Sequence, residues 1–184
     1  STPLRHLRSL LDLSPTETRR VVELARAAKA NPSELGGALA GKSIALIFAK
    51  QSTRTRISFE VGIQQLGAHA VVLSTGGGTG MQMGRGETIH DTAKVLSRYV
   101  DAIVIRTFGQ HEVDELAAHG SIPVVNALTD LYHPCQALAD LQTIAERFGS
   151  CEGRTLTWVG AGNNVAHSLA LAGSRAGMHV VLCC

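Results

Sequence analysis

The stretch Ser43-Ile44-Ala45-Leu46-Ile47-Phe48-Ala49, followed closely by Ser52-Thr53-Arg54-Thr55-Arg56, carries the clearest signal of the fold. Its first seven residues form a short, continuous apolar run, which is typical of a strand buried on both faces of a parallel sheet. The polar residues that follow open a segment, Thr55–Leu66, that is predicted to be a helix closed by Gly67. A buried strand that leads directly into a helix is the repeating unit of an α/β protein.

The same alternation continues on both sides of this stretch. Before it, Ser14-Pro15-Thr16-Glu17 forms a capping box that begins a helix, and Asn31-Pro32 ends that helix. After it, the pattern predicts strands at His69–Leu73, Asp101–Arg106 and Ile122–Asn126, and helices at Thr88–Tyr99, Glu112–His119 and Pro134–Phe148. We therefore expect an α/β fold with a doubly wound parallel sheet and right-handed crossovers.

The pattern restarts after Gly149. A strand at Thr155–Val159, a helix at Asn164–Ala176 and the start of a strand at His179–Leu182 are predicted. One such unit cannot bury its own sheet, and domains usually need at least ~50 residues. We expect residues 1–149 to form one domain with a linking helix, and residues 150–184 to begin a second, Rossmann-like α/β domain of a longer protein. A compact core built from residues 150–184 alone would contradict this expectation.

Composition excludes several classes of protein. Apolar residues make up 45% and charged residues 17% of the 184 residues, a globular balance that excludes disordered and fibrous chains. The net charge is only +2 and the chain has no basic stripe, which argues against a nucleic-acid partner. No apolar run approaches the ~18–20 residues of a membrane span. The four cysteines show neither a disulfide framework nor zinc spacing, so a reduced, cytoplasmic protein without a metal is expected.

Polar groups follow three predicted strands at the sheet edge where ligands bind in open parallel sheets. The first group is Ser52–Arg56, at the start of a helix, where free N–H groups and partial positive charge favour anions. Two arginines are unfavourable there unless an anion neutralises them. The alternative is a capped surface helix in which Arg56 pairs with Glu60, but it leaves Arg54 unexplained. The pattern therefore favours a phosphate site.

The other two groups are Arg106 and His133-Pro134-Cys135-Gln136. An arginine that leaves a buried strand often only reaches water, so Arg106 gains weight from its position at the same edge. Histidine is a poor helix cap. Either His133 and Gln136 point into the cleft, as an oxyanion donor and an amide partner, or Gln136 caps the helix and His133 lies on a loop. Together, an anion site, donors for a carbonyl oxygen and an amide partner fit an acyl or carbamoyl phosphate.

The order and spacing of these motifs resemble the aspartate/ornithine carbamoyltransferase family from about Leu10 to the last residue. The loop Met81–Thr88 lacks the lysine of the aspartate enzymes and is similar to that of the ornithine enzymes, in which Gln82 would reach the carbamoyl phosphate of a neighbouring subunit. Asp91–Arg98 and Asn163–Ser168 also resemble the ornithine enzymes. The resemblance implies an ornithine-binding role for Asn164, while the plain alternative is that the two asparagines cap a helix.

The resemblance implies transfer of a carbamoyl group from carbamoyl phosphate to the δ-amine of L-ornithine, giving L-citrulline and phosphate, as in arginine biosynthesis. Hydroxyl and guanidinium groups would hold the phosphate: Ser52, Thr53, Arg54 and Thr55. Arg56 would be a further ligand or a brace for the loop. Thr55, Arg106 and His133 would stabilise the oxyanion, and Gln136 would bind the carbamoyl NH2. The family implies a homotrimer with shared sites and needs no metal or organic cofactor.

Two departures from the family pattern leave other functions open. Gly160-Ala161-Gly162 stands where the family usually has Gly-Asp-Gly. The family's Asp…Ser-Met-Gly and His-Cys-Leu-Pro motifs, which hold the amino acid, do not occur in the chain. The acceptor could therefore be aspartate, putrescine or an acylated ornithine. A dinucleotide fold, weakly indicated by the same glycines, and a non-catalytic phosphate-binding module are the alternatives from other classes.

Overall fold

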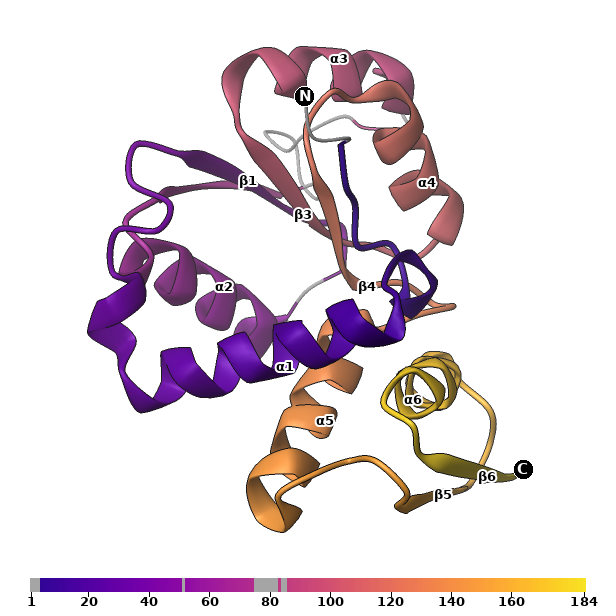
Figure 1. Ribbon diagram of the computed structural model, residues 1–184. Helices are drawn as coiled ribbons and strands as arrows, with labels where there is room; N and C mark the ends of the chain where they lie inside the picture. The colour runs from indigo at the N-terminus through magenta and orange to yellow at the C-terminus, as the bar shows by residue number, and fades with distance from the viewer. Residues whose placement is uncertain (1–3, 51, 75–82, 84–85) are drawn as a thin grey trace.

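The larger part of the molecule is a parallel sheet covered on both faces (Figure 1). The computed structural model describes residues 4–50, 52–74, 83 and 86–184. Its larger sheet has the strand order β2-β1-β3-β4 and consists of β1 (Ser43–Phe48), β2 (His69–Ser74), β3 (Ala102–Arg106) and β4 (Val124–Leu128). All neighbouring strands pair in parallel, so their carboxyl ends lie at one edge.

Helices cover both faces of this sheet. Helix α2 (Thr53–Gln65) packs through Ile63 on the face that carries Ile44 and Leu46. Helices α3 (Ile89–Tyr99) and α4 (Gln110–His119) cover the other face, together with the alternate strand residues. Because successive side chains of a strand point to opposite faces, both faces of a central strand are apolar and its sequence is a continuous apolar run. The predicted doubly wound α/β class is confirmed.

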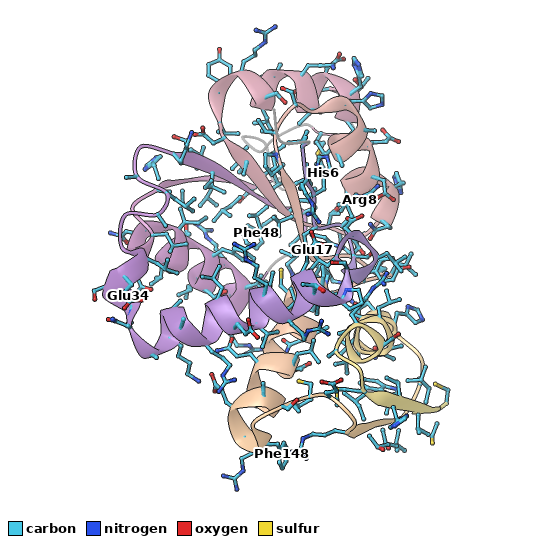
Figure 2. The ribbon with its side chains drawn as sticks, viewed as in Figure 1. His6, Arg8, Glu17, Glu34, Phe48 and Phe148 are labelled. Carbon is cyan, nitrogen blue, oxygen red and sulfur yellow. The ribbon has the colours of Figure 1, made fainter. Side chains whose placement is uncertain are left out.

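The N-terminal segment covers the free edge of β4. The backbone N–H of Leu7 donates to the carbonyl of Val124, and the N–H of Asn126 donates to the carbonyl of Leu7. The Nδ1 atom of His6 accepts from the N–H of Val124 at 3.2 Å, and the Nδ2 atom of Asn126 donates to the carbonyl of Arg8 at 2.9 Å (Figure 2). These bonds satisfy an edge that would otherwise be open to pairing with another strand.

Helix α1 (Pro15–Ala30) begins with the predicted capping box. The Ser14 Oγ atom accepts from the N–H of Glu17 at 3.2 Å, and the Ser14 N–H donates to the Glu17 carboxylate at 2.8 Å. Short 3-10 helices precede and follow α1, at Leu10–Asp12 and Pro32–Leu35. Helix α1 then crosses α5 (Pro134–Phe148), whose bounds match the prediction.

A second, two-stranded parallel sheet follows α5. It contains β5 (Thr155–Val159) and β6 (His179–Cys183), joined by α6 (Asn164–Arg175). The apolar core beneath α6 is shared with earlier helices: Leu10, Val22, Ala137, Leu141, Ala145, Leu169, Ala172, Ala176 and Met178. The described residues after Gly149 therefore pack on α1 and α5 instead of forming a core of their own. The domain boundary between residues 149 and 150 stays a prediction.

Several element boundaries differ from the predicted ones, most of them by one or two residues, and three of the differences have a clear cause. Helix α2 begins at Thr53 because Ser52 is its N-cap, and α4 begins at Gln110 because the Glu112 carboxylate accepts from the N–H of Gly109. Strand β4 runs to Leu128, which pairs with Arg106, so the strand ends nearer to the site than predicted. None of the helices in the described ranges is both long and apolar enough to cross a bilayer.

Candidate active site

The N-terminus of α2 lies at the carboxyl edge of the larger sheet. The Ser52 Oγ atom caps it by accepting from the N–H of Thr55 at 3.3 Å. The first turn holds no acidic residue, so the positive end of the helix dipole is not neutralised by the helix's own side chains. Arg54 is exposed in this turn. The first turn of α2 therefore combines unpaired helix N–H groups with an added positive charge, an arrangement that attracts anions.

Arg106 ends β3 and reaches the same helix. Its Nη1 atom donates to the Thr55 hydroxyl at 3.2 Å, across 51 residues of chain. Its Nε atom is buried and has no hydrogen-bond partner among the described residues. Burial lowers the pKa of Arg106 from its ordinary value, because a desolvated cation is less stable. A half-buried guanidinium with an unused donor is well suited to bind an anion or a carbonyl oxygen.

His133 approaches from the third predicted position. It is the N-cap of α5, but its side chain makes no capping bond, as the sequence predicts for a poor cap. Its Nδ1 atom is buried without a partner among the described residues. Burial, and secondarily the charge of Arg106, lower the pKa of His133 to about 4. The imidazole is therefore neutral at pH 7 and can donate one hydrogen bond without carrying a charge.

The low pKa of His133 predicts a pH-dependent stability. An unfolded histidine titrates near pH ~6.5, whereas folded His133 titrates at about 4. Between these values the unfolded chain binds more protons, so the free energy of unfolding falls as the pH drops through this window and is fully retained above it. Urea titrations at a series of pH values should show that the free energy of unfolding falls less in His133→Gln than in the wild type as the pH drops through this window. His179→Gln, at an exposed position, should follow the wild type; equal falls in His133→Gln and wild type would contradict the assignment.

Gln136 and Cys135 complete the start of α5. The amide nitrogen of Gln136 donates to the Asp140 carboxylate at 3.0 Å, one turn further along the helix, so Gln136 does not cap α5. This contact leaves the amide oxygen as the acceptor for an NH2 group. The Cys135 thiol donates to the Asn126 carbonyl at 3.4 Å, and burial raises its pKa to about 12. The thiol therefore stays protonated and serves to join α5 to β4.

A cavity of about 500 Å³ brings most of the predicted residues together. Six of the ten line it: Ser52, Arg54, Thr55, Arg106, His133 and Gln136. They come from α2, β3 and α5, at the shared carboxyl edge of the sheet. The cavity is thus lined by two cationic side chains, a helix N-terminus, a neutral imidazole and an amide. This space can hold an anion and place donors beside a neighbouring polar group.

The remaining predicted residues lie elsewhere. Thr53 and Arg56 line an adjoining cavity of about 690 Å³ on the other side of α2, where Arg56 contacts Glu60 at 3.4 Å. Gln82 lies outside the described residues. Asn164 begins α6, and its amide nitrogen donates to the Thr129 carbonyl at 2.7 Å. Asn163 caps α6, because its side chain accepts from the N–H groups of Val165 and Ala166. The plain alternative, in which both asparagines cap the helix, therefore holds for Asn163 and not for Asn164.

A buried serine near the site is one residue that the sequence did not single out. The Ser168 hydroxyl accepts from the backbone N–H of His133 at 2.7 Å, and Ser168 is fully buried. Its sequence signals are a polar residue on the apolar stripe of α6 and its place at the end of Asn163–Ser168, the stretch that resembles the ornithine enzymes. Thr129 is a second such residue, because its hydroxyl donates to Gln110 at 2.7 Å and accepts from the N–H of Tyr132. These bonds hold the loop that precedes His133.

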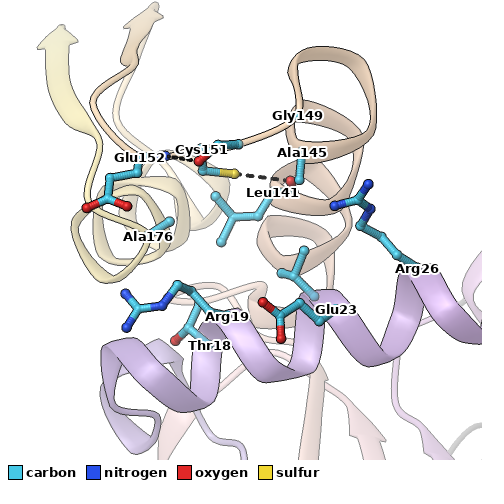
Figure 3. A pocket seen from close by; sticks show the side chains of 12 residues that line it. Thr18, Arg19, Glu23, Arg26, Leu141, Ala145, Gly149, Cys151, Glu152 and Ala176 are labelled. Atoms are coloured by element: carbon cyan, nitrogen blue, oxygen red, sulfur yellow. Dashed lines mark hydrogen bonds between the residues drawn. The ribbon is translucent and has the colours of Figure 1, made fainter.

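A smaller cavity, of about 110 Å³, lies between α1, α5 and the segment Gly149–Glu152 (Figure 3). Its wall includes Leu141, and the Cys151 thiol there donates to the Leu141 carbonyl at 3.3 Å. None of the predicted site residues lines it. The 500 Å³ cavity, which six of the predicted residues line, is therefore the candidate site. Within the part of the chain that the structure describes, no three His, Cys, Asp or Glu side chains are grouped so that they could hold a metal ion.

Comparison with known proteins identifies the family. Residues 5–146 match the family model described as aspartate/ornithine carbamoyltransferase, carbamoyl-P binding domain. The chain belongs to the aspartate/ornithine carbamoyltransferase family. The match covers every residue of the 500 Å³ cavity, and it confirms the resemblance seen in the sequence motifs.

Individual relatives of this carbamoyltransferase family agree. The chain is 50% identical over 182 residues to an ornithine carbamoyltransferase of Listeria monocytogenes serotype 4b (strain F2365), covering 99% of this chain and 57% of the relative. It is 55% identical over 179 residues to that of Parafrankia sp. (strain EAN1pec), covering 96% and 56%. The structure of the Pyrococcus furiosus ornithine carbamoyltransferase matches with a TM-score of 0.91 at 47% identity, over 97% of this chain and 56% of that one. The chain thus spans somewhat more than half the length of these carbamoyltransferases.

Proposed function

We propose that the protein transfers the carbamoyl group of carbamoyl phosphate to the δ-amine of L-ornithine, giving L-citrulline and phosphate. One observation carries the proposal: the half-buried Arg106 guanidinium bonds Thr55 at the N-terminus of α2 and has an unused donor beside the neutral His133. This arrangement suits a substrate that joins a phosphate to a carbonyl group. The names of the relatives support ornithine as the acceptor.

In the proposed reaction, the N-terminus of α2 binds the phosphate through the side chains of Ser52, Arg54 and Thr55, which line the cavity. Thr53, whose side chain lines the adjoining cavity, contributes as part of the same helix N-terminus. Arg56 braces this turn through Glu60. The deprotonated amine attacks the carbonyl carbon, a C–N bond forms, and negative charge develops on the carbonyl oxygen. Thr55, Arg106 and His133 stabilise this oxyanion, and such a preorganised donor contributes roughly 10²–10³ in rate. The C–O bond to phosphate then breaks, and the departing phosphate takes the proton that the amine nitrogen loses.

Two further residues complete the proposed site. The Gln136 amide oxygen accepts from the carbamoyl NH2 group, since its amide nitrogen is engaged by Asp140. Asn164 contacts the amino acid, because α6 begins beside the loop that leads to His133. Gln82 of a neighbouring subunit reaches the carbamoyl phosphate, so the sites are shared between subunits. Membership of the family supports a homotrimer as the assembly. The reaction requires no cofactor, since phosphate is already an activated leaving group.

The setting proposed for this activity is arginine biosynthesis in the cytoplasm. The cysteines described are free, and Cys183 and Cys184 are exposed at the end of β6. Exposed thiols are suited to a reducing compartment.

A related acceptor is the second candidate. The chain also matches the structure of an N-acetyl-L-ornithine transcarbamylase mutant complexed with carbamyl phosphate and N-succinyl-L-norvaline, with a TM-score of 0.81 at 37% identity. The described cavity is built for the carbamoyl phosphate half of the reaction, so it is equally compatible with an acylated ornithine. The choice of acceptor therefore rests on the greater identity to ornithine carbamoyltransferases such as that of Listeria monocytogenes, at 50%, than to this N-acetyl-L-ornithine transcarbamylase, at 37%.

Two measurements on the protein test this function. Calorimetry should show binding of carbamoyl phosphate, with acetyl phosphate and inorganic phosphate as weaker competitors. The described residues supply the carbamoyl phosphate half of the site, so carbamoylation should then be assayed in a protein that also contains the family's amino-acid-binding motifs. Ornithine, aspartate, putrescine and N-acetylornithine are tested in parallel, and citrulline from ornithine is the expected product. Binding without product from any acceptor would favour a non-catalytic phosphate-binding module. An absence of carbamoyl phosphate binding would refute the assignment of the cavity.

A further inference from the structure

One face of α6 holds the loop that ends at His133. Three residues at spacing i, i+3 and i+4, which share a helix face, contact the backbone of this loop. The Asn164 amide donates to the Thr129 carbonyl at 2.7 Å, the His167 Nδ1 atom lies 3.1 Å from the Leu131 carbonyl, and the Ser168 hydroxyl accepts from the His133 N–H at 2.7 Å. The loop between β4 and α5 is therefore fixed from outside by a later part of the chain.

The contact of Ser168 is the one that reaches His133 itself. The N–H groups at the start of a helix have no acceptor within that helix, and His133 is the N-cap of α5. Ser168 supplies the missing acceptor from a different element, 35 residues further along the chain. Its side chain is fully buried, so water cannot replace the hydroxyl without a rearrangement of the packing.

The imidazole of His133 depends on this backbone contact for its position. Its Nδ1 atom is buried and unpaired among the described residues, so no hydrogen bond at that atom orients the ring. The direction of the ring is then set by the backbone that carries it and by the packing around it. A shift of the His133 backbone would move the ring relative to Arg106, which lines the same cavity.

We propose that Ser168 is a positioning residue for His133, and that α6 thereby sets the geometry of the carbonyl donor in the candidate site. This inference rests on the proposed role of His133 in the reaction. It assigns to Ser168 a function that acts through His133, without any contact with substrate. Ser168 therefore links the unit that follows α5 to the site at the edge of the larger sheet.

Histidine NMR on the full 184-residue chain tests the proposal. The ring titration of His133, assigned with His133→Gln, has an expected midpoint of about 4 in the wild type because of burial and the nearby Arg106 charge. Ser168→Ala removes the acceptor, and the freed loop should let the midpoint rise by at least one pH unit toward the ordinary value. Ser168→Thr keeps the hydroxyl and should restore the wild-type midpoint. Ser174→Ala, an exposed serine on the same helix, is the matched control and should change nothing.

Carbamoyl phosphate affinity provides the second readout. Ser168→Ala should weaken binding several-fold while Ser168→Thr and Ser174→Ala do not. If Ser168→Ala does not fold, Ser168→Cys, which keeps the size but weakens the acceptor, takes its place with the same expectations. An unchanged His133 midpoint and unchanged affinity in the folded variant would overturn the proposal. If Ser168→Ala shifts the His133 midpoint but the wild-type protein does not bind carbamoyl phosphate, the proposed function is refuted. The positioning role of Ser168 would still be supported.

Discussion

An Arg106→Met variant is expected to bind carbamoyl phosphate about 10- to 100-fold more weakly than the wild type. Hydrogen bonds to charged groups contribute about 1.5–3 kcal/mol each. The buried Nε atom of Arg106 is unpaired among the described residues, and its Nη1 atom donates to Thr55 at the N-terminus of α2. Methionine keeps the unbranched side chain but supplies no donor and no charge. Isothermal titration calorimetry of the two proteins measures the difference directly.

The same substitution should leave the unliganded protein at least as stable as the wild type. Arg106 is partly desolvated, and no salt bridge to it is found among the described residues. Replacing an uncompensated, desolvated charge by an apolar side chain removes a cost of folding. The melting temperature of Arg106→Met should therefore match or exceed that of the wild type, and carbamoyl phosphate should raise only the wild-type value. Arg98→Met, at an exposed position of α3, is the control; wild-type affinity in Arg106→Met would rule out the assigned role.

Arg54→Ala is expected to weaken carbamoyl phosphate binding by about tenfold or more, by the loss of one charged hydrogen-bond donor. Arg54 lies in the first turn of α2 and lines the 500 Å³ cavity. Its charge adds to the positive end of the helix dipole, so the loss should be greater at low ionic strength than at high ionic strength. Calorimetric titrations at two salt concentrations test both parts.

Arg56→Ala is the matched control for Arg54→Ala. The two arginines lie two residues apart on the same helix, but Arg56 faces the adjoining cavity and contacts Glu60 at 3.4 Å. An exposed pair of this kind contributes about 0–1 kcal/mol, so the affinity should change by less than about fivefold. Equal losses in the two variants would show a general effect of positive charge and would contradict a specific site at Arg54.

The fold was predictable because its strands are buried on both faces. In Ile44–Phe48, the residues that face α2 and the residues that face α3 and α4 are all apolar, so this run differs clearly from the polar segments around it. The ends of elements were less predictable. Strand β4 ends at Leu128 and not at Asn126, because Leu128 pairs with Arg106 and its carbonyl accepts from the N–H of Thr107. These contacts join different strands, so the local sequence pattern does not predict them.

The candidate site was predictable to the extent that it follows from topology. The carboxyl ends of parallel strands meet at one edge, so residues placed after β1, β3 and β4 had to converge there, and the 500 Å³ cavity shows that they do. The contact of Ser168 with His133 was not predictable, because it joins residues 35 positions apart through tertiary packing. The outward placement of Arg56 likewise depends on the rotation of α2 against the sheet.

The shared core beneath α6 has a consequence for biosynthesis. Leu10 and Val22, near the beginning of the chain, are buried against Leu169 and Ala176, which the ribosome adds some 150 residues later. Contacts between segments so distant in sequence form slowly, since a long loop must close before they are made. The apolar face of α1 therefore completes its packing only after α6 has emerged from the ribosome, and until then its newly made surface is open to chaperones.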